Sequence, residues 1–145
     1  MPPRILAIDY GRKHIGLALS DELGLTAQPL EVLIHRNRRE DVRRLREICR
    51  KRGVSLILVG HPLHITGEAG EMANEAARFA ARLGKELGIA VKLSDERLTS
   101  WEAQQTSADM NSAARRKGAP LDAIAAAILL REYLDAGRAQ TEGKE

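Results

Sequence analysis

Short apolar runs separated by glycines and charged residues dominate the first 35 positions of the chain. Residues 5–9 and 14–20 are two such runs joined by a glycine-containing turn, which predicts a pair of neighbouring strands. Gly24 and Pro29 bracket an expected loop. Residues 30–34 predict a third strand, and the charge within this run favours a position at a sheet edge.

The pattern then changes to alternating helices and strands. Residues 38–52 carry apolar positions at helical spacing, and Gly53 is a stop signal for that helix. Residues 55–60 are almost continuously apolar, which is typical of a central parallel strand covered on both faces. A strongly amphipathic helix follows, ends at Gly88, and leads into a short strand over 89–93.

The last third of the chain is expected to be mainly helical. Thr99–Glu102 fits a capping box, so a helix is expected to start there. Residues 111–119 are rich in basic residues and predict a mobile loop. Pro120 suits the first turn of a final helix that reaches about Ala136.

This order of elements predicts an α/β fold with a five-stranded mixed sheet and helices on both faces. Residues 1–137 are expected to form a single domain, and residues 138–145 a polar C-terminal tail. In sheets of this kind, sites form just outside the carboxyl ends of the parallel strands. Asp9, Asp95 and Glu96 each follow a predicted strand, so we expect them to converge on one edge.

Composition excludes several classes of protein. The chain has 145 residues, of which 43% are hydrophobic, so it can bury a core and is not a disordered polymer. The single cysteine, Cys49, excludes an internal disulfide and a zinc site built on cysteines. The sequence start lacks the apolar region of a signal peptide, and no apolar run approaches a membrane span. We therefore expect a cytoplasmic protein with no membrane partner.

Three acids, Asp9, Glu96 and Asp122, are the candidate catalytic and metal-binding residues. Hydrolysis of a phosphodiester needs an activated water and stabilisation of the leaving oxygen, and two divalent cations roughly 4 Å apart can supply both. Magnesium and manganese prefer oxygen ligands, chiefly carboxylates. Asp95 is a further candidate for the second acid, although it could instead cap the helix that follows.

Each acid also has a structural interpretation. Asp9 could cap the turn after its strand through its side chain. Asp122 lies in the first turn of a helix, where the helix dipole favours a negative charge. Glu96 could form a surface ion pair with Arg97 or Arg131, which would contribute little to stability.

Basic residues close to these acids in the sequence are candidates for binding substrate phosphates. Lys13 lies in the turn after the first strand, and Arg97 follows the second candidate acid directly. Arg115, Arg116 and Lys117 precede the last helix, where their charges could hold the scissile strand.

Two further polar features fit either a functional or a structural role. The arginine-rich segment 36–52 could be a phosphate track, or a solvated helix face with pairs such as Glu40 with Arg44. His61 and His64 have a spacing that suits a turn, but zinc needs three or four ligands and no third is evident.

These motifs together resemble the YqgF/RuvX family, small bacterial proteins of the ribonuclease H-like superfamily. The family is described as nucleases of pre-16S ribosomal RNA or as resolvase-like proteins. The resemblance implies a ribonuclease H-like fold and a carboxylate site using Mg²⁺ or Mn²⁺. It also implies a structured RNA or branched DNA substrate, and Asp9, Glu96 and Asp122 as the catalytic acids. The motifs are Asp9-Tyr10-Gly11 through Gly16, Gly60-His61-Pro62-Leu63, Gly67, Asp95-Glu96-Arg97-Leu98-Thr99 and Asp122-Ala123-Ile124-Ala125-Ala126.

The expected activity is therefore metal-dependent hydrolysis at the 5′ end of pre-16S ribosomal RNA during ribosome biogenesis. A Holliday junction resolvase acting on branched DNA and a non-catalytic RNA-binding assembly factor are the alternatives. A phosphotransferase also fits the Asp-x-Gly hairpin, but such folds need two lobes with nucleotide between them. Either a monomer or a homodimer fits the sequence.

Overall fold

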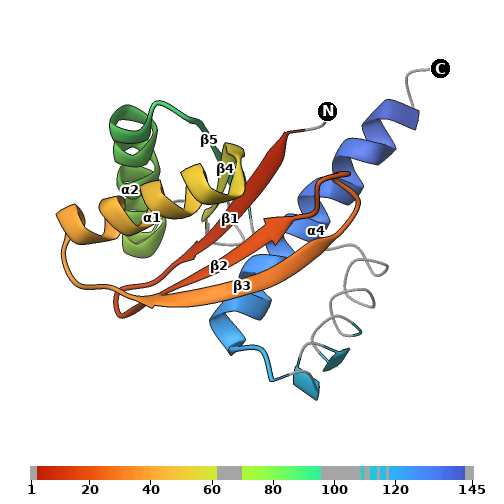
Figure 1. Ribbon diagram of the computed structural model, residues 1–145, viewed down its shortest axis with the longest axis horizontal. Coiled ribbons are helices and arrows are strands. Elements are labelled where there is room, and N and C mark those ends of the chain that lie inside the picture. Colours follow the sequence, from red (N-terminus) through yellow and green to blue (C-terminus); the bar gives the residue numbers. More distant parts are fainter. Residues whose placement is uncertain are drawn as a thin grey trace.

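The computed structural model describes residues 3–61, 70–95, 109, 112–113, 115–116 and 118–142. Its centre is a five-stranded sheet in the order β3-β2-β1-β4-β5 (Figure 1). β2 is antiparallel to both of its neighbours, whereas β1, β4 and β5 are mutually parallel. The predicted α/β class with a five-stranded mixed sheet is confirmed. The strands are β1 (Arg4–Tyr10), β2 (His14–Ser20), β3 (Ala27–Ile34), β4 (Val54–His61) and β5 (Ala90–Asp95).

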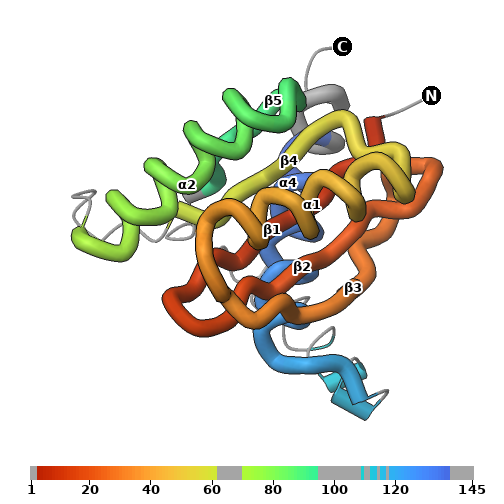
Figure 2. The backbone as a smooth tube through the Cα atoms, turned by 60° about the vertical axis from the view of Figure 1, so that its left-hand side comes forward, coloured from red at the N-terminus to blue at the C-terminus, as the bar shows by residue number. Residues whose placement is uncertain are grey.

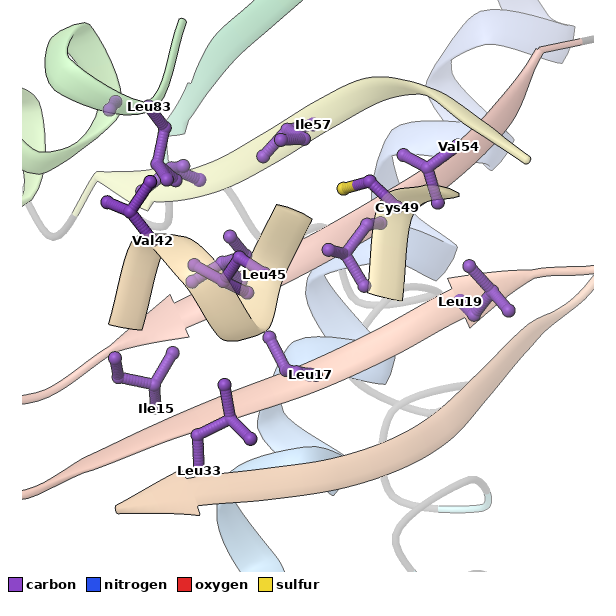
Figure 3. Packing of buried hydrophobic residues seen from close by; sticks show 14 of the residues in the cluster. Ile15, Leu17, Leu19, Leu33, Val42, Leu45, Cys49, Val54, Ile57 and Leu83 are labelled. Atoms are coloured by element: carbon purple, nitrogen blue, oxygen red, sulfur yellow. The ribbon is translucent and has the colours of Figure 1, made fainter. Parts of the chain in front are cut away.

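Helices cover both faces of this sheet, as Figures 1 and 2 show. On one face, α1 (Arg38–Arg52) and α2 (Glu71–Leu87) enclose the larger core cluster. Figure 3 shows Val42 and Leu45 of α1 lying over the sheet in this cluster. On the other face, α4 (Leu121–Glu142) lies against β1, β2 and β3.

The layer under α4 is built from small residues, which lets the helix approach the strands closely. Ala7 and Ala18 of the sheet pack with Ala126 and Ala127 of α4. The closest approach is at Gly16, where an added Cβ atom would lie 2.0 Å from the backbone carbonyl oxygen of Asp122. Only glycine fits at that position of β2 without displacing the start of α4.

The ends of the first two helices follow the predicted signals. Asn37 caps α1 by accepting a hydrogen bond from the backbone N–H of Glu40 at 2.9 Å. Gly53 and Gly88 end α1 and α2 in the left-handed conformation, with φ angles of 68° and 66°.

Two boundary predictions were wrong. β3 begins at Ala27 and contains Pro29, which had been predicted to lie in a loop. The residue is tolerated because β3 is an edge strand and its register with β2 shifts at this point. α4 continues through Gly137 to Glu142 rather than ending in a polar tail. Adding residues to an existing helix is easy, so one internal glycine does not stop it.

The expected basic loop over 111–119 is also partly helical. Residues 112, 113, 115 and 116 have helical backbone, and Gly118 turns the chain with a φ of 82° before α4. Alanine and arginine are strong helix formers, which explains the difference. The capping box over 99–102 lies outside the described residues.

Two further findings concern the helices and the single cysteine. Within the residues that the structure describes, no helix is long and apolar enough to cross a membrane. Cys49 is a core residue of α1, and its burial raises the pKa of the thiol to about 11. A thiol with such a high pKa is a weak nucleophile at neutral pH.

Candidate active site

Asp9 lies at the carboxyl end of β1, on the sheet face that α4 covers. Side chains alternate between faces along a strand, and Ile5 and Ala7 pack in the cluster beneath α4. Asp9 comes two residues after Ala7, so it faces the same side of the sheet, and it pairs in register with Gly16 of β2. Because the backbone of Asp122 contacts Gly16, the two carboxylates come from neighbouring positions, although 112 residues separate them in the chain.

The environment of Asp9 disfavours its negative charge. Burial and the nearby charge of Asp122 raise the pKa of Asp9 from its usual 3.8 to about 6. Neither carboxylate has a hydrogen bond or an ion pair with another side chain in the described part of the chain. Two adjacent acids with no compensating cation are costly unless a metal ion or proton joins them.

A third acid at this edge would come from the end of β5. The register of β1, β4 and β5 sets Asp9 level with Gly60 and Ser94, with Asp95 one residue further along. Strands lie about 4.8 Å apart, so the ends of β1 and β5 are about 10 Å apart. The backbone of Asp95 is therefore at the same edge as Asp9. Glu96 lies outside the described residues.

The basic candidates have different placements. Lys13 is exposed in the β1–β2 turn, and its carbonyl oxygen accepts a hydrogen bond from the backbone N–H of His35 at 2.9 Å. Arg115 and Arg116 are exposed ahead of α4, and Arg116 Nε donates to the carbonyl oxygen of Ser112 at 3.3 Å. Arg97 and Lys117 are outside the described residues.

Two arginines suggested as partners of surface acids form ion pairs with other acids. Arg131, a suggested partner of Glu96, pairs with Asp135 on α4 at 3.2 Å. Glu40 and Arg44, the pair suggested for a solvated helix face, take other partners: Glu40 pairs with Arg36 at 3.6 Å, and Arg44 turns inward to Asp41 at 2.6 Å. A buried carboxylate attracts that guanidinium more strongly than a solvated one.

Two features of this end of the sheet were missed by the sequence analysis. Gly16 was noted in an apolar run and in a family motif but was given no packing role, although a glycine inside a strand is a known signal of close backbone approach. Asp41 is completely buried and holds His35 and Arg44. Its spacing from Leu45 places it on the buried stripe of α1, and an acid there signals a structural charge cluster.

The acid pair fits a divalent cation better than any other common ligand. Its ligand atoms are carboxylate oxygens, which magnesium and manganese prefer. Within the described residues, no group of three or more His, Cys, Asp and Glu side chains is close enough to hold a metal ion. A cation held by Asp9 and Asp122 would therefore need a further ligand from outside those residues or from the substrate.

The fold is ribonuclease H-like, of the type found in Holliday junction resolvases. It matches RuvC of Thermus thermophilus, solved in complex with a Holliday junction substrate, with a TM-score of 0.59 and 18% identity, over 94% of this chain and 96% of that one. It also matches the fowlpox virus Holliday junction resolvase, with a TM-score of 0.55 and 16% identity, over 92% of this chain and 99% of that one.

The chain belongs to the RuvX family, whose model is described as "Holliday junction resolvase" and matches residues 3–136. Curated relatives carry the name "Putative pre-16S rRNA nuclease". One from Symbiobacterium thermophilum is 45% identical over 94% of this chain and 95% of its own length. Another from Syntrophus aciditrophicus is 42% identical over 92% of this chain and 89% of its own length. The predicted family and fold are confirmed.

Proposed function

We propose that this protein is a metal-dependent endonuclease that hydrolyses phosphodiester bonds in structured nucleic acid. The observation that carries the proposal is the contact between Gly16 and the backbone of Asp122, which sets Asp122 beside Asp9. The raised pKa of Asp9 supports it, because a carboxylate destabilised by burial and by a neighbouring acid gains from binding a cation.

Asp9, Glu96 and Asp122 are the proposed ligands of Mg²⁺ or Mn²⁺. Bound cations of this kind supply an activated water and stabilise the leaving oxygen in phosphodiester hydrolysis. Glu96 is proposed rather than Asp95 because the resemblance to the family implies Glu96 as the catalytic acid.

Five basic residues are proposed to neutralise the substrate backbone: Lys13, Arg97, Arg115, Arg116 and Lys117. The exposed positions of Lys13, Arg115 and Arg116 support this role. Contacts of this kind add affinity that falls steeply with salt concentration and carry no sequence information.

The leading substrate is the 5′ region of pre-16S ribosomal RNA, because the curated relatives are named for that RNA. The description of the family model favours a second candidate, branched DNA of the Holliday junction type. A non-catalytic role in ribosome assembly would use the same basic residues without needing the acid pair. We propose that the protein acts in the cytoplasm, as a monomer or homodimer.

The test compares the parent protein with Asp9→Asn on a pre-16S leader RNA and on a four-way DNA junction, each with Mn²⁺. We expect Asp9→Asn to lose cleavage by about 10³-fold or more while keeping its fold. Asp135→Asn is the control, since that acid lies on α4 in an exposed pair with Arg131. Equal cleavage by Asp9→Asn would overturn the acid assignment. Tight RNA binding without cleavage by metal-loaded parent protein would favour the assembly factor.

A further inference from the structure

We propose a second site, on the opposite face of the sheet, that binds one unpaired nucleotide of the substrate strand. This inference rests on the proposed nuclease function. The site is a pocket of about 510 Å³ between the end of β1, the start of α1 and the middle of α2. That volume lies within the range of small-ligand sites, about 300–1,000 Å³. Its principal lining residues are Tyr10, His35, Arg38, Arg78, Phe79 and Arg82.

The wall has more positive charge than its own carboxylates can neutralise. Arg12 pairs with Glu75 at 3.1 Å. Asp41 pairs with Arg44, which does not line the pocket. Arg38, Arg78 and Arg82 also line the pocket, and none of them forms an ion pair with a carboxylate in the described part of the chain. Guanidinium groups in such a setting bind phosphate well because they offer paired N–H donors.

The same wall offers aromatic surface beside these cations. Tyr10 and Phe79 are in ring contact, with centroids 4.6 Å apart and planes 31° apart. The ring of His35 meets Tyr10 edge-on, with centroids 6.1 Å apart. Aromatic side chains next to a basic groove are the usual means of holding an unpaired base and its phosphate together.

His35 is held in a fixed orientation by a fully buried carboxylate. Its Nδ1 donates a hydrogen bond to Asp41, whose side chain also accepts from the backbone N–H of Arg36 and from Arg44. The ring nitrogen left for a ligand is therefore Nε2. The buried charge cluster around Asp41 therefore holds the His35 ring in place at the pocket wall.

The position of the pocket connects it to the acid pair. Tyr10 directly follows Asp9 in β1, and consecutive strand residues point to opposite faces of a sheet. The two sites thus lie back to back at one end of β1. A strand crossing this edge can set a phosphate at Asp9 and a neighbouring nucleotide at Tyr10. A base within a duplex cannot enter such a pocket without leaving the stack, so the ligand must be unpaired.

The first experiment measures binding of AMP in metal-free buffer by calorimetry. The variants are Arg82→Ala and Arg78→Ala, with Arg43→Ala as a matched control on α1, where Arg43 pairs with Glu47 away from the pocket. We expect both pocket variants to weaken AMP binding about tenfold or more, since each removes a charged hydrogen-bond donor. The control should bind like the parent protein. Adenosine and inorganic phosphate should each bind more weakly than AMP.

The second experiment measures cleavage of an RNA with unpaired nucleotides next to the cleavage point. Arg82→Ala should raise KM about tenfold with little change in kcat, because the residue binds and does not react. Equal KM values for Arg82→Ala and Arg43→Ala would overturn the pocket while leaving the loss of cleavage by Asp9→Asn intact. Phosphate binding as tight as AMP would overturn the base contact. Failure of the nuclease proposal itself would appear instead as unchanged cleavage by Asp9→Asn.

Discussion

The two faces of the sheet differ sharply at the carboxyl end of β1, although one strand supplies both. On the α4 face, Asp9 and Asp122 place two acids together with no compensating cation among the described residues. On the α1–α2 face, every carboxylate of the pocket wall is paired, and the surplus charge is positive. One face is therefore suited to a metal ion, and the other to a phosphate.

The difference shows how little sequence is needed to separate two kinds of chemistry. Asp9 and Tyr10 are adjacent, and the alternation of side chains along a strand sends them to opposite layers. Packing then decides the environment on each side. Small residues let α4 close over the acid, whereas the start of α1 and the middle of α2 leave the pocket open.

The largest effect that separates the two faces is expected from Asp122→Asn. Removing this acid should lower kcat for metal-dependent cleavage by about 10²-fold or more, because a proposed ligand of the cation is lost. AMP binding in metal-free buffer should stay unchanged, since the pocket is on the other face. Steady-state kinetics and calorimetry measure the two readouts. A parallel fall in both would contradict the separation of the faces.

Gly16→Ala should be the next largest change. Its Cβ would lie 2.0 Å from the carbonyl oxygen of Asp122, so the start of α4 must move. We expect a loss of about 2–4 kcal/mol in the free energy of unfolding, from urea melts, together with a fall in kcat.

The matched control for that substitution is Gly84→Ala in α2. Its Cβ would meet Val91 at 3.5 Å, which is an ordinary contact. Replacing a glycine inside a helix by alanine should therefore stabilise the protein, by up to about 1 kcal/mol. If both variants were equally stable, the close packing of α4 on β2 would not restrict position 16 to glycine.

Asp41→Asn tests the opposite face with a smaller effect on catalysis. The change weakens the hydrogen bonds that Asp41 forms with His35 and Arg44, leaving a half-buried arginine uncompensated. We expect a loss of about 2–3 kcal/mol in unfolding free energy and weaker AMP binding. The kcat of cleavage at saturating substrate should change less than twofold. A kcat as low as that of Asp122→Asn would show that the two faces are coupled.

The smallest effect is a pH dependence of stability in metal-free protein. The folded state keeps a proton on Asp9 up to a pKa of about 6, whereas the unfolded chain releases it near 3.8. Stability should therefore fall by about 2 kcal/mol as pH rises from 4 to 7, and the fall should vanish in Asp9→Asn. Urea melts across this range measure it. Saturating Mn²⁺ should offset the loss, because the cation binds the ionised acid.

Much of the fold follows from local sequence signals. The apolar run of β4 predicted a central parallel strand, and Gly53 and Gly88 marked the ends of two helices. The start of β3 was predicted wrongly because a proline fits within a strand only at a sheet edge. The position of β3 in the sheet is set by the whole fold and cannot be read from the local sequence. The end of α4 was predicted too early, because an existing helix can extend through one unfavourable residue such as Gly137.

The candidate site was predictable in part. Asp9 and Asp122 were chosen for their residue type and their places after a strand and at a helix start, and the structure brings them together. The pocket was not predicted, because its residues come from three elements and share no local pattern. Glu96 stays a prediction, since it lies outside the described residues.

The close seat of α4 on Gly16 also fixes when the acid pair can form during synthesis. Asp9 emerges from the ribosome early, but its partner belongs to α4, which is made more than a hundred residues later. α4 can dock on the sheet only after this helix has emerged. A nascent chain that has not yet made α4 therefore lacks the paired acids.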